Sequence, residues 1–203
     1  PGLASGQVEL VLHDDNQLRD VERIATASGV TVGVHVEIDS GMRRGGSRDS
    51  DALTLIHGVM KSKAIRLAGV MTHFTDAGRD TASTTHEHDA FLSLMDRVGR
   101  LPRDCKLHVA ATAATVRSTD YHHDLVRIGL GWAGWVPGDP AASRRLGLKP
   151  AVNWTSRVIH IHQLSAGDRV GYGGLWTAPR DTCIGLVPVG YADGLPPTAG
   201  ATA

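Results

Sequence analysis

Short apolar runs alternate along the first two thirds of this chain with segments in which apolar residues recur every three to four positions. The runs are rich in Val, Ile and Leu and predict strands, whereas the three-to-four spacing predicts amphipathic helices. Asp14 and Asp15 are typical helix N-cap residues, and Gly29 is a typical stop. The predicted strands are 8–12, 32–38, 65–73, 107–111 and 125–130, and the predicted longer helices are 14–29, 50–60 and 85–98.

This alternation of strand and helix favours a parallel sheet with helical crossovers, which both a barrel and an open doubly wound sheet possess. The positions of polar residues favour the barrel, because they follow strand ends, where barrel enzymes hold their chemistry. Those residues are Asp39 with Arg44, His73, Thr112 and Arg127. We therefore predict an α/β fold, a partial (β/α)8 TIM-type barrel made of about its last five βα units.

The pattern changes after Pro150, where apolar and polar residues begin to alternate with a period of two. Residues 152–162 alternate in this way, residues 166–168 are typical of a turn, and residues 183–189 predict another strand. No helical spacing separates these segments. We therefore predict a boundary near residue 145, with a barrel domain over 1–145 and part of an all-β domain over 146–203.

Composition and charge exclude several classes of partner. Lys plus Arg and Asp plus Glu both total 21, so no net field attracts nucleic acid or an anionic membrane. The two cysteines, Cys105 and Cys183, lie in unrelated contexts, which indicates free thiols in a reducing compartment. No apolar segment is long enough to span a bilayer and no signal peptide is visible. We expect a cytoplasmic protein without a nucleic-acid or membrane partner.

Two tyrosines, each flanked by glycines, are the most informative local feature. They lie in Val170-Gly171-Tyr172-Gly173-Gly174 and Gly190-Tyr191-Ala192-Asp193-Gly194. Glycine removes bulk beside a phenol, so a ligand can approach it closely. A phenol with a pKa near 10 needs nearby cations or hydrogen bonds before it can act as a base. Taken alone, Tyr172 is more often explained as a core or edge-strand aromatic residue.

Several segments in the same order along the chain resemble alanine racemases, and the resemblance covers nearly the whole sequence. They are 35–45, Thr72-His73-Phe74, 109–114, 122–130 and the two tyrosine segments. The resemblance implies a pyridoxal 5'-phosphate enzyme with a barrel and a β domain, acting as a homodimer whose subunits share the active site. It also implies interconversion of L-alanine and D-alanine by two-base proton transfer at Cα, supplying D-alanine for peptidoglycan in the cell wall.

The resemblance assigns roles to residues of the barrel domain. Arg44 contacts the substrate carboxylate and the phenolic oxygen of the cofactor, which suits a planar, permanently charged guanidinium. Glu37 stands where many relatives have a carbamylated lysine; it is either a substitute that orients Arg44 or an ordinary strand-end glutamate. His73 lies beside the cofactor ring, and the hydroxyl of Thr112 binds phosphate, although Ala111 replaces an asparagine common in the family.

The remaining roles concern the cofactor nitrogen, its phosphate and proton transfer. Arg127 faces the pyridine nitrogen and, because arginine cannot accept a proton, leaves the ring a weaker electron sink. The backbone N–H groups of Gly129 and Leu130 cradle phosphate. Tyr172, from the partner subunit, is the base on one face of Cα, with His73 and Arg127 completing the catalytic set, and Tyr191 lines the route of the substrate beside it.

One element of the family pattern is missing from these residues. The family's second base is the lysine that bonds covalently to the cofactor, and none of Lys61, Lys63, Lys106 and Lys149 lies in a matching strand-end motif. By the resemblance it belongs to a strand upstream of Pro1, and the rest of the β domain lies beyond Ala203. We therefore expect a piece of a longer protein, unable to racemise by itself.

Other interpretations remain open. The protein could racemise serine or a broader range of amino acids, or be a D-amino-acid aldolase of the same fold type, although the two tyrosine segments argue against the aldolase. It could also be a non-catalytic homologue that only binds pyridoxal phosphate. Two histidine pairs, His86 with His88 and His160 with His162, lack a third ligand, so we expect no metal site.

Overall fold

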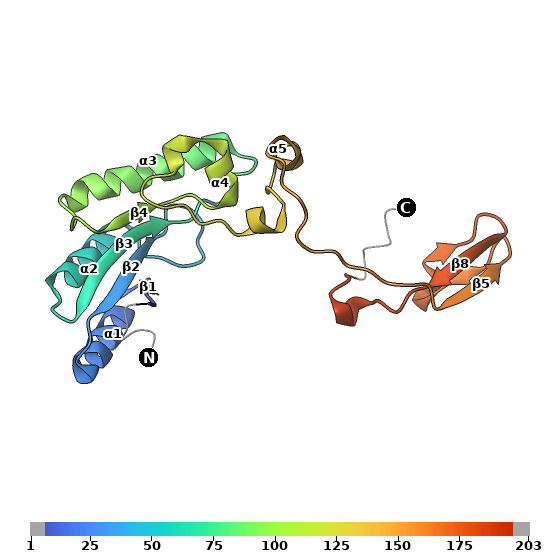
Figure 1. Ribbon diagram of the computed structural model, residues 1–203, viewed down its shortest axis with the longest axis horizontal. Coiled ribbons are helices and arrows are strands. Elements are labelled where there is room, and N and C mark those ends of the chain that lie inside the picture. The colour runs from blue at the N-terminus through green and yellow to red at the C-terminus, as the bar shows by residue number, and fades with distance from the viewer. Residues whose placement is uncertain (1–6, 197–203) are drawn as a thin grey trace. The chain divides into compact units, whose positions relative to one another are not determined.

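A computed structural model describes residues 7–196 of the chain and divides it into two compact units, Pro1–Ala151 and Val152–Ala203 (Figure 1). The division falls a few residues after the boundary expected near residue 145. Each unit has its own secondary structure and is described by itself.

The first unit is built from successive strand–helix pairs. Its four strands are parallel and lie in the order β1-β2-β3-β4, the same order as along the chain. A doubly wound sheet reverses its strand order at a switch point, whereas a barrel adds each strand beside the previous one. The predicted α/β fold is therefore confirmed, and the strand order agrees with the predicted partial barrel. The elements are β1 (Leu10–Leu12), α1 (Asp15–Ser28), β2 (Val32–Ile38), α2 (Asp49–Lys61), β3 (Ile65–Thr72), α3 (Thr81–Val98), β4 (Lys106–His108), α4 (Thr112–Arg117), η1 (Thr119–Tyr121), η2 (Leu130–Ala133) and α5 (Pro140–Arg145).

The predicted ends of α1 are confirmed. The Asp14 side chain accepts a hydrogen bond from the backbone N–H of Gln17, and Gly29 closes the helix in the left-handed conformation, with φ of 64°. Helix α3 begins at Thr81, earlier than the predicted residue 85. The reason is a cap that the prediction missed, because the Asp80 carboxylate accepts from the backbone N–H of Ser83.

The predicted fifth strand, residues 125–130, is reduced to a single parallel bridge between Ala111 and Arg127. The backbone N–H of Arg127 donates to the carbonyl of Ala110, as a strand residue would. Beyond it the N–H groups of Gly129 and Gly131 donate to the Thr112 hydroxyl instead of to a neighbouring strand. The chain therefore leaves the sheet after one pair and forms η2.

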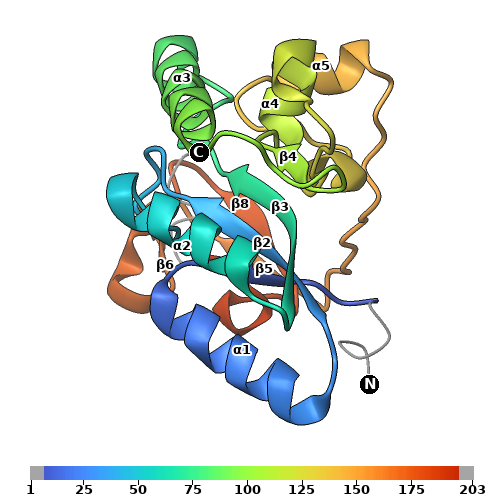
Figure 2. The same cartoon turned by 90° about the vertical axis from the view of Figure 1, so that its left-hand side faces the viewer.

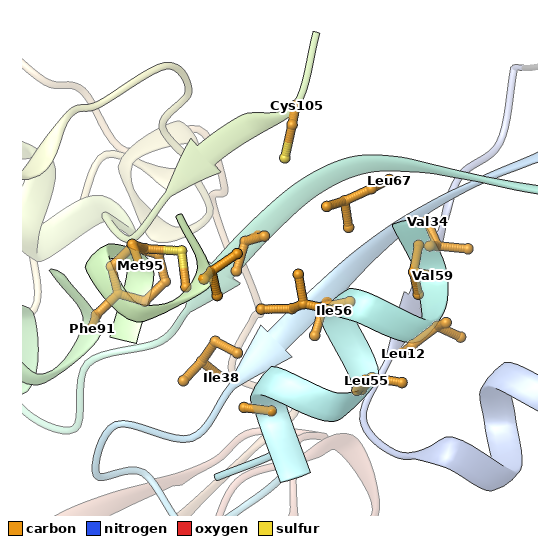
Figure 3. Packing of buried hydrophobic residues seen from close by; sticks show 14 of the residues in the cluster. Leu12, Val34, Ile38, Leu55, Ile56, Val59, Leu67, Phe91, Met95 and Cys105 are labelled. Carbon is orange, nitrogen blue, oxygen red and sulfur yellow. The ribbon is translucent and has the colours of Figure 1, made fainter. Parts of the chain in front are cut away.

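Alternate residues of each strand face opposite sides of the sheet. On the helix side, β2 buries Val32, Val34, Val36 and Ile38 beneath α1 and α2, and Figure 3 shows Leu55, Ile56 and Val59 of α2 packed against this layer. Figure 2 shows α1 and α2 lying along this side of the sheet. The other face of β2, formed by residues 33, 35 and 37, is open to the functional groups described below.

The second unit contains two small antiparallel sheets. β5 (His160–Leu164) pairs with β8 (Thr182–Leu186), and β6 (Arg169–Val170) pairs with β7 (Trp176–Thr177). The short helices η3 (Tyr172–Gly174) and η4 (Tyr191–Asp193) carry the two tyrosine segments. The prediction of a strand from residue 152 was wrong at its start, since residues 152–159 lie outside strands and only the part from His160 pairs with β8. Among residues 7–196, no helix combines the length and apolar character needed to cross a membrane.

Candidate active site

Arg127 lies at the carboxyl-end rim of the sheet, where the ends of β3 and β4 hold its guanidinium. Its Nη2 donates to the carbonyl of Thr72 at 2.8 Å, and its Nη1 donates to the carbonyl of His108 at 2.9 Å. Nη2 also lies 3.4 Å from the carbonyl of Val109. Burial lowers the pKa of Arg127, while the nearby Glu37 carboxylate opposes this shift. Main-chain acceptors from two strands thus fix the direction of this cation.

Two imidazoles contact the same guanidinium. Nη1 of Arg127 lies 2.8 Å from Nδ1 of His108, and Nη2 lies 3.4 Å from Nδ1 of His73. A guanidinium only donates hydrogen bonds, so both Nδ1 atoms must accept and each neutral ring carries its proton on Nε2. Burial, reinforced by the charge of Arg127, lowers the pKa of His108 to about 4 and also lowers the pKa of His73. Arg127 therefore lies between two neutral histidines.

Thr112 brings two backbone N–H groups together at the start of α4. Its Oγ1 accepts from Gly129 and from Gly131, both at 3.2 Å. A Cβ at position 131 would lie 2.9 Å from Cγ2 of Ile128, so the close approach of this segment requires glycine there. Because the two N–H groups use the lone pairs of the hydroxyl, its own proton is left to donate to another acceptor.

A cavity of about 510 Å³ joins these groups. Its wall includes five residues that the sequence assigned to cofactor binding, together with apolar side chains and backbone of the neighbouring segments. The five are His73, Thr112, Arg127, Gly129 and Leu130. Guanidinium, imidazole and hydroxyl donors thus surround one concave space with apolar walls, the usual composition of a small-molecule site.

Arg44 lies in the loop between β2 and α2 and is exposed. Its charge contributes to lowering the pKa of His73, after burial and Arg127, so the loop reaches the same side of the unit. Within the described part of the chain, no hydrogen bond or ion pair holds the Arg44 guanidinium. The loop itself is fixed, because the Asp39 carboxylate accepts from the N–H groups of Gly41 and Arg43 and from the Arg43 side chain. Arg44 is therefore available for a ligand.

Glu37 has a different contact from the one that the sequence suggested. Its carboxylate lies 2.9 Å from Nε2 of His13, and no ion pair joins it to Arg44 among residues 7–196. The His13 ring in turn lies against Gly45, where an added Cβ would come within 2.8 Å of it. The pair of His13 and Glu37 therefore supports the loop that carries Arg44, and direct orientation of Arg44 by Glu37 stays a prediction.

The two tyrosines of the second unit point into solvent within their own unit. The residue Tyr172 is 98% exposed and Tyr191 is 77% exposed. Gly171, Gly173 and Gly174 all have positive φ, between 57° and 73°, so this turn requires glycines beside Tyr172. The Arg169 guanidinium fixes the turn by donating to the carbonyls of Gly173 and Gly174. Neither phenol is an aromatic core residue of its own unit, which contradicts the interpretation of Tyr172 as a core residue there.

Sequence reasoning missed several polar residues that lie next to this site. His108, His35, Glu9 and His13 are all within hydrogen-bond contact of one another or of a residue named above. The available sign was strand alternation, because His35 and Glu37 occupy the same face of β2, opposite its buried valines. In the second unit, His160 and His162 share one face of β5, with ring centroids 4.3 Å apart.

Comparisons with known proteins agree with this geometry. The family model for the alanine racemase N-terminal domain matches residues 2–137, and that for the alanine racemase C-terminal domain matches residues 151–202. The alanine racemase of Salinispora arenicola is 34% identical over 205 residues, which cover 98% of this chain and 54% of that protein. The alanine racemase of Vibrio atlanticus is 32% identical over 201 residues, with 98% and 54% covered.

Solved structures give the same result. Alanine racemase from Streptomyces coelicolor A3(2) matches with a TM-score of 0.87 at 27% identity, over 99% of this chain and 54% of that one. Biosynthetic alanine racemase from Pseudomonas aeruginosa matches with a TM-score of 0.79 at 30% identity, over 93% and 51%. The chain thus spans about half the length of the relatives that it matches. On the two family models and these relatives, the chain belongs to the alanine racemase family.

Proposed function

We propose that this chain forms part of a pyridoxal-phosphate-dependent racemase that interconverts L-alanine and D-alanine. The observation that carries the proposal is the fixed guanidinium of Arg127, held by strand-end carbonyls and two imidazole acceptors in the wall of the cavity. Such a cation presents hydrogen-bond donors but accepts no proton. That property suits a group facing the ring nitrogen of the cofactor.

The cavity fits the cofactor chemically. The hydroxyl proton of Thr112 and the N–H group of Leu130 form a polar corner suited to phosphate, and apolar walls suit a flat ring. The N–H of Gly129 already donates to the Thr112 hydroxyl, so Gly129 supports this corner by holding the threonine. When bound, pyridoxal phosphate supplies an electron-withdrawing ring that makes the substrate Cα–H more acidic. Arg127 would donate a hydrogen bond to the ring nitrogen and would give up no proton of its own.

The residues around the cavity divide the remaining work. Arg44, exposed and without a partner in residues 7–196, binds the substrate carboxylate as a planar fork. The neutral His73 has its Nε2–H free to donate, because Arg127 occupies Nδ1. We propose that this donor faces Tyr172 and holds its phenol in position. Tyr172 then takes or returns the Cα proton on one face of the substrate, and Tyr191 lines the route to it.

Racemisation needs a second proton-transfer group on the opposite face of Cα, and the family resemblance assigns it to a lysine that is not among the lysines of this chain. We propose that the first unit binds cofactor and that the second supplies the tyrosines to a partner subunit in a homodimer. Exposed apolar side chains of the first unit, Trp132, Trp135 and Leu146, support such an interface. From the same assignment we also propose that the protein is cytoplasmic and that it supplies D-alanine for the cell wall.

The experiment uses the full-length protein, with an absorbance band of bound cofactor and conversion of each alanine enantiomer as the two measurements. Tyr172→Phe should impair removal of the proton from one enantiomer far more than from the other, because the phenol acts on a single face. A small and equal loss in both directions would contradict the role of Tyr172. Absence of both cofactor binding and racemisation in the unaltered protein would contradict the proposed function, and serine in the same assay tests a broader substrate range.

A further inference from the structure

A continuous row of hydrogen-bonded side chains runs from Arg127 to the opposite end of the sheet. Nε2 of His108 lies 2.8 Å from Nδ1 of His35, and Nε2 of His35 lies 2.8 Å from Oε2 of Glu9. The other oxygen of Glu9 accepts from Arg66 at 2.6 Å. We call Glu9, His35 and His108 the histidine relay. It joins the N-terminal ends of β1 and β3 to the rim of the cavity.

The direction of every hydrogen bond in the relay is determined by its two ends. Arg127 can only donate, so Nδ1 of His108 accepts and its proton is on Nε2. That proton must go to Nδ1 of His35, which places the proton of His35 on its own Nε2. An ionised Glu9 carboxylate can only accept, so the row ends there. The hydrogen bond from His35 is the largest cause of the lowered pKa of Glu9.

Two glycines make room for the relay. A Cβ at Gly69 would lie 2.3 Å from Nδ1 of His35, and a Cβ at Gly33 would lie 2.8 Å from both the Glu9 carboxylate and the Arg66 guanidinium. Both glycines are inside strands, where glycine is unfavourable unless another group needs the space. The register of β2 and β3 also shifts between Val34 and His35, which brings His35 opposite Gly69. Strand sequence and register thus both accommodate the relay.

Because the two histidines of the relay are largely buried, each of their N–H donors needs an acceptor within the protein. The His108 residue is only 4% exposed, and the His35 side chain is 14% exposed. If His35 offered no acceptor, the buried Nε2–H of His108 would lose its partner, which is costly. The ring could then move its proton to Nδ1, where it would oppose the N–H of Arg127. The guanidinium would lose one of the contacts that set its direction.

We propose that Glu9 and His35 are positioning residues for Arg127, acting by holding His108 as the tautomer that accepts from the guanidinium. The proposal rests on the proposed function, because Arg127 is the group that faces the cofactor ring there. Neither Glu9 nor His35 lines the cavity, and His35 reaches Arg127 only through His108. They act through His108 alone.

The first test is independent of cofactor and activity. In the full-length protein labelled with ¹⁵N-histidine, NMR at neutral pH should give His35 and His108 as neutral rings protonated at Nε2. Signals are assigned from His35→Asn and His108→Asn variants. In His35→Leu, the His108 signals should move toward a mixture of tautomers. An unchanged His108 tautomer in His35→Leu overturns the proposal.

The second test measures the effect on Arg127. His35→Leu should lower kcat for alanine by about tenfold or more with little change in KM, as for loss of other groups that orient a site residue. It should also change the pH dependence of the bound-cofactor absorbance. His35→Asn places an acceptor oxygen near the former Nδ1 and should restore most of the loss. His86→Leu, an exposed histidine of α3, is the matched control and should behave as the unaltered protein.

Glu9→Ala provides a second variant in case His35→Leu does not fold. It should fold more readily, because Glu9 is at the partly exposed end of the relay. It should shift the same absorbance profile in the same direction, by a smaller amount. Normal profiles and kcat in both His35→Leu and Glu9→Ala overturn the positioning role but leave the racemase assignment intact. If the unaltered protein neither binds cofactor nor racemises alanine, the proposed function and the positioning role are both contradicted. The NMR experiment still tests the hydrogen bonds of the histidine relay in that case.

Discussion

The two faces of the parallel sheet use alternate residues of the same strands for opposite purposes. On the helix side of β2, Val32, Val34, Val36 and Ile38 form an aliphatic layer with α2. On the other side, His35 and Glu37 bind polar partners from segments that are distant along the chain. The aliphatic face is stabilised by the apolar area that it removes from water, and this contribution does not depend on the direction of individual contacts. The polar face depends on direction, because a hydrogen bond weakens steeply when donor and acceptor are misaligned.

A substitution on the aliphatic face gives the first test of these separate roles, and we expect it to have the largest effect on stability. Ile56→Ala removes a fully buried side chain of α2 and should lower the free energy of unfolding by about 2–5 kcal/mol. Denaturant unfolding measures this loss. Racemisation per folded molecule should stay close to normal, because Ile56 does not reach the cavity. A selective loss of kcat in a well-folded Ile56→Ala protein would contradict the separation of the two faces.

The polar face should make the stability of the protein depend on pH. Burial and Arg127 lower the pKa of His108 from 6.5 to about 4, so the unfolded chain binds more protons than the folded one between those pH values. Stability from this group is complete above pH 6.5 and is lost as the pH falls toward 4, by roughly 3 kcal/mol in total. Unfolding measured from pH 7 to pH 4 gives the slope.

A matched variant separates His108 from the other histidines whose pKa values are lowered, namely His73, His88 and His123. His108→Asn keeps an oxygen acceptor near the position of Nδ1 but has no proton to gain. Its stability should fall less steeply between pH 6.5 and 4 than that of the unaltered protein. Equal slopes would mean that His108 is not held neutral by its surroundings.

The two faces also differ in how far the sequence could predict them. The aliphatic face follows from local periodicity, so the strands 32–38 and 65–72 and the caps of α1 at Asp14 and Gly29 were predicted almost to the residue. Family motifs placed His73, Thr112 and Arg127 at strand ends, and the structure brings them to one cavity.

Contacts between distant segments could not be predicted in the same way. His35 meets Glu9 across 26 positions and His108 across 73, and no local pattern encodes such a pairing. The loss of the fifth strand has a similar origin, because the hydroxyl of Thr112 takes the N–H groups of Gly129 and Gly131 from outside their own segment. In the second unit, alternation over residues 152–159 predicted a strand, but pairing with β8 begins only near His160.

The most specific test of the polar face is a substitution that keeps charge and changes only direction. Arg127→Lys retains a cation, but a single ammonium offers three donors and cannot meet Thr72, His108 and the cavity as a planar fork does. We expect kcat for alanine to fall by about a hundredfold, comparable to losing one preorganised electrostatic contact. Arg103→Lys, at an exposed position, makes the same chemical change and should leave kcat unaltered. If Arg127→Lys matched this control, charge alone would be sufficient at position 127, and the ordered acceptors around the guanidinium would have no part in the reaction.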